Sequence, residues 1–164
     1  MSRLLGQILT YAAFAAVIGL FSAWPEYHML DQEEAVVSLS FSHAAQRMGE
    51  CRQLSQAELN ELPPNMRKPN SCPRERHSAY VEVRADNEVL FAETLSPSGL
   101  WQDGKINVYH RSTLSAGEYR LFIGMNDSGR DAGFDYEHTA DLRIGAGQNL
   151  VIGFNNLSKT FVIE

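Results

Sequence analysis

Residues 4–24 read Leu-Leu-Gly-Gln-Ile-Leu-Thr-Tyr-Ala-Ala-Phe-Ala-Ala-Val-Ile-Gly-Leu-Phe-Ser-Ala-Trp, and none of these side chains is charged. A helix of this length rises about 1.5 Å per residue and so matches the hydrocarbon core of a bilayer, which is about 30 Å thick. Inside lipid every backbone polar group must be paired, and a helix pairs these groups within the segment itself. The stretch therefore predicts one membrane-spanning helix within residues 1–25 that tethers the rest of the chain.

A cleaved signal peptide is the alternative interpretation, with Arg3 as its minimal positive region. The segment Phe21-Ser22-Ala23 fits a cleavage site poorly, because Phe21 stands where a small residue is required. We therefore expect an uncleaved anchor. Arg3 precedes the helix and an acidic segment, 26–34, follows it, so the positive-inside rule predicts a cytoplasmic N-terminus. The expected location is a bacterial inner membrane, with the C-terminal part in the periplasm.

Small residues recur at four-residue spacing along the same helix, at Ala12, Ala15, Ala16 and Gly19. Such spacing lets a second helix approach closely and gain van der Waals contact. Alanine and glycine are also common in membrane helices that have no specific partner. The spacing is therefore consistent with a helix-packing face and with an ordinary lipid-facing helix.

The chain has 164 residues, so 140 residues follow Trp24, which is enough for one domain with a sizeable core. Only Arg3 of the 14 Lys and Arg residues precedes residue 25, and none of the 20 acidic residues does. The part after the helix therefore has 13 basic against 20 acidic residues, a net charge of −7. Such acidity disfavours nucleic acid and anionic lipid headgroups as partners. It suits solubility or a basic protein partner.

From residue 79 onward, short stretches rich in Val, Ile, Leu and aromatic residues alternate with turn signals. Together with the alternating segment 35–42, they predict about eight strands at intervals of roughly a dozen residues. We expect an all-β fold: an antiparallel β-sandwich, immunoglobulin-like or jelly-roll-like, over residues 35–164, after a linker at 26–34. The predicted core residues are Val81, Val83, Leu90, Val108, Tyr119, Leu121, Ile123, Leu142, Val151, Ile152 and Phe154.

An insertion at 43–77 interrupts the strand pattern. Cys51 and Cys72 are the two cysteines of the chain, and an even count in an exported domain predicts a disulfide. A metal site would require further soft ligands at close spacing. Ser55-Gln-Ala-Glu58 is a capping box that predicts a short helix from Gln56 to about Leu62.

The insertion is the basic part of an acidic domain and is a candidate protein interface. An excursion of this size is often functional, although it could equally be a lid over one end of the core. Trp101 lies in a separate loop, where a tryptophan commonly plugs the end of a sandwich, anchors an interface or stacks on a sugar. The residues assigned to this possible interface are Arg67, Lys68, Arg74, Arg76 and Trp101.

No nucleophile elbow, phosphate-binding loop or dinucleotide motif occurs in the sequence. The five histidines show no metal-ligand spacing, and each is expected to be solitary and exposed. We therefore predict that the chain is not an enzyme and needs no cofactor. The weak candidates for a metal site are the oxygen ligands Asp127, Asp131, Asp135 and Glu137, whose spacing is not that of an EF-hand and whose run contains an opposing cation, Arg130.

One helix followed by an exported β domain is typical of small accessory subunits of membrane complexes, which is an analogy of architecture alone. We expect a non-catalytic accessory subunit, or an assembly or stability factor, that contacts a larger inner-membrane complex through both its helix and its exported domain. The expected type of complex is an electron-transfer complex, respiratory or photosynthetic. The alternative is a membrane-tethered periplasmic binding module for a small ligand, a sugar or Ca²⁺.

Overall fold

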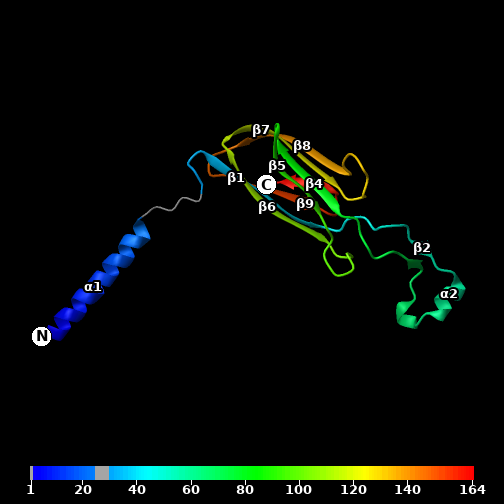
Figure 1. The fold of residues 1–164 in the computed structure, drawn as a ribbon, viewed down its shortest axis with the longest axis horizontal. Helices are drawn as coiled ribbons and strands as arrows, with labels where there is room; N and C mark the ends of the chain where they lie inside the picture. Colours follow the sequence, from blue (N-terminus) through cyan, green and yellow to red (C-terminus); the bar gives the residue numbers. More distant parts are fainter. Residues whose placement is uncertain (1, 25–29) are drawn as a thin grey trace. The chain divides into compact units, whose positions relative to one another are not determined.

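The computed structural model describes residues 2–24 and 30–164. The chain divides into two compact units, Met1–Asp31 and Gln32–Glu164. Part of the predicted linker, residues 25–29, lies outside the described residues. Figure 1 shows the helix of the first unit and the strands of the second.

The first unit contains the helix α1 (Ser2–Ala23). Its large apolar side chains are exposed over the whole circumference, including Leu5, Phe14 and Phe21. Residues Arg3–Ala23 are long and apolar enough to cross a membrane, as judged by length and composition, although a signal sequence would satisfy the same criterion. An apolar surface on all sides is unfavourable in water, so the helix must be covered by lipid or by protein.

The second unit, called the β domain below, is built from two four-stranded sheets. The first sheet contains, in spatial order, β10 (Thr160–Ile163), β9 (Asn149–Asn155), β1 (Glu34–His43) and β6 (Ile106–Ser115). The second contains β5 (Glu88–Leu95), β4 (Ala79–Ala85), β7 (Gly117–Asn126) and β8 (Tyr136–Ile144). The predicted all-β character is confirmed.

The two sheets share one hydrophobic core. Val37 and Ile152 of the first sheet and Val81 and Ile123 of the second belong to the same buried cluster. Most of the predicted core residues are buried, and Leu90, Tyr119 and Leu142 are partly buried against the cluster. The prediction of Val151 is wrong, because Leu150, Ile152 and Phe154 are the inward residues of β9 and strand side chains alternate.

One strand pair differs from the expected antiparallel arrangement. β1 pairs antiparallel with β6 but parallel with β9, with Val36 opposite Asn149 and Leu39 opposite Ile152. A parallel pair needs a long crossover between its strands. The chain from residue 44 to residue 148 supplies that crossover, so two strands far apart in sequence lie side by side.

β1 is also more buried than its alternation predicted. The alternation in 35–42 puts Val37 and Leu39 on one face and Val36 and Ser38 on the other, yet all four residues are buried. The Ser38 hydroxyl donates to Asn149 Oδ1 at 2.8 Å, which satisfies this polar side chain where it is removed from water. β1 is therefore a central strand in position and in burial.

The outer face of the second sheet carries a small aromatic cluster. The Phe134 ring, from the loop between β7 and β8, packs beside Tyr80 and Phe122 at centroid distances of 6.1 and 5.4 Å. Arg84 lies over the Phe122 ring at 4.5 Å. Phe134 can occupy this place because Gly124 has no side chain, since a Cβ there would lie 2.6–2.8 Å from three atoms of the ring.

We predict that Gly124→Ala lowers the free energy of unfolding by about 1–3 kcal/mol, because the new methyl group displaces Phe134. Gly153→Ala is the matched control, since its nearest heavy atom would be Ser40 O at 3.9 Å. The control should be neutral or slightly stabilising. The measurement is the urea midpoint of the full-length chain in detergent micelles. Equal midpoints for both variants would contradict the packing of Phe134 on Gly124.

Candidate functional site

Long connections gather at one end of the β domain, called the loop end below. β1 finishes there at His43, while the opposite end, the Glu34 end, is where the chain enters the domain. Strand register places the other connections beside His43, because Ile106 pairs with His43 and Asn126 pairs with Tyr80 near the start of β4. The loop end thus consists of the segments 44–78, 96–105, 127–135 and 156–159.

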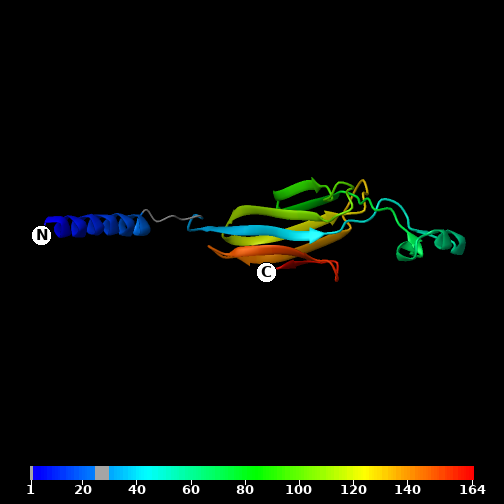
Figure 2. The ribbon, with the colours of Figure 1, turned by 90° about the horizontal axis from the view of Figure 1, so that it is seen from below.

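The insertion forms a two-stranded arm that extends beyond the ends of the sheet strands (Figure 2). Its base is closed by the backbone hydrogen bonds Met48 N–H to Glu75 O and His77 N–H to Gln46 O, both 2.9 Å. The predicted disulfide between Cys51 and Cys72 is present, and it lies next to this base, farther along the arm.

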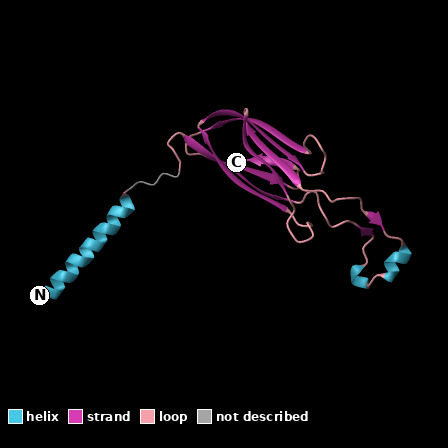
Figure 3. Ribbon diagram, in the orientation of Figure 1, coloured by secondary structure: helices cyan, strands magenta, loops and turns pink. Residues whose placement is uncertain are grey.

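Beyond the disulfide come the short strands β2 (Arg52–Gln53) and β3 (Asn70–Ser71), which pair antiparallel. Figure 3 shows these strands and, at the tip, two helical turns, α2 (Gln56–Glu61) and η1 (Pro64–Met66). The paired strands were not predicted, because two residues are too few for an alternating pattern to be seen.

The arm tip is organised by hydrogen bonding rather than by burial, since α2 has no buried residue. The predicted capping box is present: the Ser55 hydroxyl accepts from the Glu58 N–H, and Glu58 accepts from the Ser55 N–H at 2.8 Å. The hydrogen bond from the Ser55 N–H, with those from Arg52 and the Ser55 hydroxyl, lowers the pKa of Glu58 from 4.5 to about 2. The carboxylate form of Glu58 therefore stabilises the start of the helix.

We predict that the α2 cap is fully formed above pH 4.5 and is lost as the pH falls through about 2, because the folded form holds Glu58 ionised. The readout is the NMR shift of the Ser55 amide proton during acid titration of the full-length chain in micelles. Glu58→Gln is the control and should remove this titration. A midpoint near 4.5, that of an unperturbed carboxyl, would contradict the prediction.

Most of the predicted basic interface residues are engaged within the chain. Arg74 donates two hydrogen bonds to Asp103 Oδ2, at 3.1 and 2.6 Å. Arg76 donates to the carbonyls of Asp103 and Ala45, at 3.1 and 2.6 Å. Both arginines thus fasten the loop 96–105 to the base of the arm.

The remaining two basic residues lie at the arm tip. Arg67 donates to Leu62 O at 3.0 Å and to Asn60 O at 3.4 Å, so it caps the end of α2. Lys68 has no hydrogen-bond or ion-pair partner among residues 2–24 and 30–164. Three of the four predicted cations are therefore structural supports, and Lys68 differs from them.

Large apolar side chains are exposed on the loops of this same end. Leu100 is 91% exposed, Trp101 70% and Leu157 96%. Met66, at the arm tip, and Met48, at its base, are also exposed. The predicted interface residue Trp101 is thus free of the core and does not plug the end of the sheets.

A buried polar cluster lies beneath these loops. His43 and Asp127 are 0% and 1% exposed, and His43 Nε2 is 2.6 Å from Asp127 Oδ2. Asn156 Nδ2 donates to Ser42 O, so its Oδ1 must accept from His43 Nδ1, at 2.7 Å. Gln46 Nε2 donates to the other Asp127 oxygen at 3.0 Å. A hydrogen must also lie between His43 Nε2 and Asp127 Oδ2, because the lone pairs of these two atoms would repel each other at 2.6 Å.

The expectation that each histidine is exposed is therefore wrong for His43. The signal was present in the sequence, because His43 continues the inward series Val37, Leu39 and Phe41 at a period of two. Its partner Asp127 could not be identified, since the pairing joins residues 84 positions apart.

We predict that Asp127→Ala destabilises the β domain by about 3–5 kcal/mol, because it leaves a buried imidazole without its partner. Asp131→Ala is the control, as it removes an exposed carboxylate from the same loop and should change stability by less than about 0.5 kcal/mol. Urea unfolding of the full-length chain measures both values. Equal effects of the two substitutions would show that the His43–Asp127 contact contributes nothing specific.

The acidic residues that were weak metal candidates have separate roles. Asp135 accepts from the Asp127 N–H, the Ser128 N–H and the Ser128 hydroxyl at 2.8–3.0 Å, and it pairs with Arg130. Burial raises the pKa of Asp135, but these hydrogen bonds and the Arg130 cation outweigh it and the net direction is downward. Asp131 is exposed.

Glu137, the fourth candidate, is exposed on β8. In the described part of the chain no group of three or more His, Cys, Asp or Glu side chains is placed to hold a metal ion. The structure therefore does not bring the four acidic residues together as one set of ligands.

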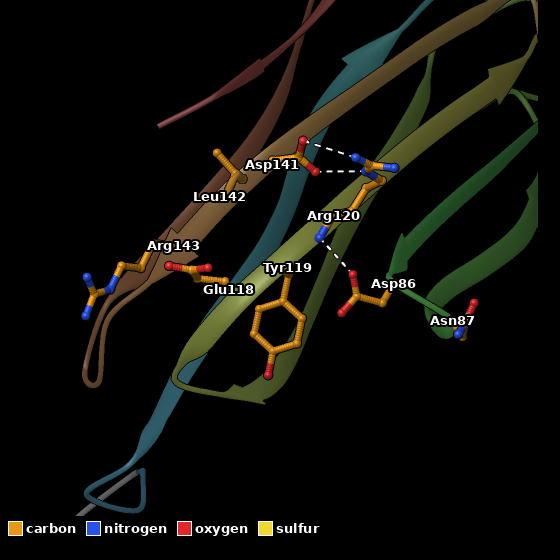
Figure 4. Close-up of a pocket in the computed structure, with 8 residues that line it drawn as sticks. All are labelled: Asp86, Asn87, Glu118, Tyr119, Arg120, Asp141, Leu142 and Arg143. Carbon is orange, nitrogen blue, oxygen red and sulfur yellow. Dashed lines mark hydrogen bonds and ion pairs between the residues drawn. The ribbon is translucent and has the colours of Figure 1, made fainter.

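A groove of about 920 Å³ lies at the Glu34 end, over β7, β8 and the turn between β4 and β5 (Figure 4). Arg120 donates to both oxygens of Asp141, at 2.8 and 3.3 Å, and Asp86 accepts from the Arg120 backbone N–H at 2.8 Å. Glu118 and Arg143 are opposite each other in the register of β7 and β8. The hydrogen bonds from Arg120 to Asp141 raise the pKa of Arg120 and lower the pKa of Asp141. The groove contains no buried unpaired polar atom among the described residues.

A second groove, of about 450 Å³, lies at the loop end between the base of the arm and the start of β4. Asn126 and His77 line it, and neither was singled out from the sequence as a site residue. No protein-family model and no curated protein matches the chain. The site must therefore be interpreted from its own geometry.

Proposed function

We propose that the chain is a non-catalytic, single-pass accessory subunit or assembly factor that binds a larger membrane-protein complex through its loop end. The observation that carries the proposal is the exposure of Leu100, Trp101 and Leu157 on loops of one end of the β domain. Single exposed apolar residues are ordinary, but the two adjacent large ones, Leu100 and Trp101, favour a protein partner. Tryptophan is the residue most enriched among those that dominate binding energy at interfaces.

The loop that carries Trp101 is held in place before any partner binds. Asp103 accepts hydrogen bonds from Arg74 and Arg76, on its carboxylate and its backbone carbonyl respectively. Within the loop, the Gly104 N–H donates to Ser98 O at 2.9 Å. A loop ordered in advance loses less conformational entropy on binding. These contacts favour an interface role for Trp101, because they hold its loop in one conformation.

The position of the loop end also supports the proposal. β1 runs ten residues from Glu34, where the chain enters the β domain, to His43 at the loop end. An extended strand of this length spans about 33 Å. The point where the chain enters the β domain and the proposed docking surface thus lie at opposite ends of the same strand.

We place the protein in a bacterial inner membrane, with α1 spanning the bilayer, the N-terminus cytoplasmic and the β domain periplasmic. The apolar helix and the Cys51–Cys72 disulfide support this location, because disulfides persist in oxidising compartments. An immunoglobulin-like or jelly-roll-like sandwich stays a prediction, as do the electron-transfer type of the partner complex and the helix-packing role of Ala12, Ala15, Ala16 and Gly19.

The alternative function, a membrane-tethered binding module for a small ligand, a sugar or Ca²⁺, also stays a prediction. The groove at the base of the arm is the observation that favours it.

We predict that tagged full-length protein, extracted in mild detergent, brings with it a stoichiometric set of membrane proteins. The triple variant Leu100→Ser, Trp101→Ser, Leu157→Ser should reduce their recovery at least tenfold, because it removes the exposed apolar side chains. Tyr109→Ser is the matched control, since Tyr109 is 73% exposed but lies on the strand β6. Quantitative mass spectrometry measures the recovery.

Two outcomes would overturn the proposal: wild-type protein that purifies alone, or undiminished recovery with the triple variant. Ala12→Leu and Ala16→Leu test the helix separately. If the helix contributes a packing face, either substitution weakens recovery while the loop end is intact.

A further inference from the structure

One sheet edge of the β domain is open along its whole length. β6 is the last strand of the first sheet, and no strand lies on its outer side in the described residues. It pairs with β1 from the Glu34/Ser115 pair to the His43/Ile106 pair without a shift of register, so the edge is regular. An open, regular edge presents unpaired backbone N–H and C=O groups and is a template for a further strand.

The register shows which backbone groups of β6 point outward. The Val36 N–H donates to Gln148 O at 2.8 Å, on the β9 side of β1, and Val36 is opposite Thr113 of β6. The pair of Val36 and Thr113 is therefore a non-hydrogen-bonded pair of the β1–β6 ladder, so the N–H and C=O of Thr113 point away from β1. The same holds for every second residue of β6, and all of these side chains are exposed: Asn107, Tyr109, Arg111, Thr113 and Ser115.

The other three edge strands in the described residues are protected in ways that β6 is not. β10 has four residues, the pairing of β5 with β4 is interrupted by a shift of register, and β8 contains three charged side chains. Short edges, bulges and charged edge residues are the means by which β proteins avoid pairing edge to edge. β6 has ten residues, and Arg111 is its one Lys, Arg, Asp or Glu residue.

A second copy of the chain is the occupant that fits this edge. Each chain has one unprotected edge among its described strands, so pairing two such edges leaves neither of them open and closes the assembly as a dimer. A two-fold axis perpendicular to the sheet makes the two β6 strands antiparallel. Identical edges are then complementary, because each outward-pointing residue supplies both a donor and an acceptor.

The side chains of β6 select the register of this pairing. Outward-pointing residues must face one another across the new pair, and three such registers centre near the middle of β6. One sets Arg111 opposite Arg111, where like charges repel. A second sets Tyr109 opposite Tyr109 and overlaps a shorter part of the strand. The register between them sets Tyr109 opposite Arg111 and Asn107 opposite Thr113, and it pairs residues 106–114 of the two copies.

Tyr109 and Arg111 are both available for a contact across this pair. Tyr109 is 73% exposed. Arg111 has no hydrogen-bond or ion-pair partner among residues 2–24 and 30–164. A guanidinium over a tyrosine ring is attractive, and the two-fold axis forms this contact twice.

We propose that two copies of the chain form a dimer by pairing their β6 strands antiparallel in this register. The four-stranded first sheet of each copy then continues into that of the other. This interface goes beyond the docking function, because it uses the edge of β6 and none of Leu100, Trp101 and Leu157.

The first test is the molar mass of the full-length chain in detergent micelles, measured by light scattering with the detergent mass subtracted. At about 100 μM, which detects a Kd of about 100 μM or lower, the wild-type chain should have the mass of two copies. Thr113→Pro should raise the Kd at least about tenfold, because it removes an outward N–H from each copy and leaves the pairing with β1 intact. Thr113→Val keeps this N–H and a β-branched side chain, and it should dimerise as the wild type does.

A double variant, Asn107→Cys with Thr113→Cys, tests the register. The Cα atoms of a hydrogen-bonded antiparallel pair lie about 5.5 Å apart, within the range of a disulfide. Residues 107 and 113 of one chain are about 20 Å apart along the strand, so they cannot be bridged within a copy. Mild oxidation should therefore give a covalent dimer of the double variant and not of either single variant, as measured on denaturing gels without reductant.

The mass of a single copy at about 100 μM, an undiminished dimer in Thr113→Pro, or equal crosslinking of the single and double variants would overturn the dimer. So would loss of the larger complex from tagged Thr113→Pro protein with full recovery by Thr113→Val, because the edge would then receive a strand of that complex. The triple loop variant should lose the larger complex and keep the dimer, so either proposal can fail without the other.

Discussion

The contact between His43 and Asp127 is the constraint on which the loop end depends. Each side chain is almost wholly buried, and their separation is 2.6 Å. His43 ends β1 and Asp127 follows β7, so the contact joins one strand of each sheet at the point where both sheets finish. Asn156 and Gln46 complete the hydrogen bonding, and through them the turn after β9 and the base of the arm are attached to the same centre. A buried polar contact of this kind stabilises a fold only when every member is satisfied, and it also selects one arrangement of the loops over others.

The sheets and the arm are stabilised by different physical means. The sheets share a continuous hydrophobic core, whereas Ala45 is the arm residue that belongs to the core cluster. The arm relies instead on backbone pairing, the Cys51–Cys72 disulfide and the hydrogen bonds of Arg67, Arg74 and Arg76. A segment without a core opens at a lower free energy than the domain that carries it, unless it is crosslinked. The disulfide, which joins two residues 21 positions apart in the sequence, therefore gives the arm an order that its composition alone could not.

The sequence predicted features that depend on local periodicity and failed where distant segments meet. The succession of strands after residue 79 and the capping box at Ser55 follow from patterns within a few residues, and the structure contains them. The parallel pairing of β1 with β9 could not be predicted, because period-two alternation fixes which side chains face inward but not which strand lies alongside. The site showed the same division. The disulfide was readable from composition, whereas the groove at the base of the arm depends on strand register and on loop geometry that no local pattern records. For His43, the inward orientation of the side chain could be predicted from the alternation in β1, whereas its partner Asp127 could not.

The central position of β1 has a mechanical consequence. If the loop end is held by a partner and α1 by a membrane, tension enters the β domain at Glu34 and runs along β1 toward His43. β1 is hydrogen-bonded to β6 on one side and to β9 on the other, so a pull along its axis shears two ladders at once. Hydrogen bonds loaded in shear must break together, whereas those of a hairpin peeled from its end break one after another. The strand that connects the tether to the loop end is thus the strand best placed to transmit force without unfolding the domain.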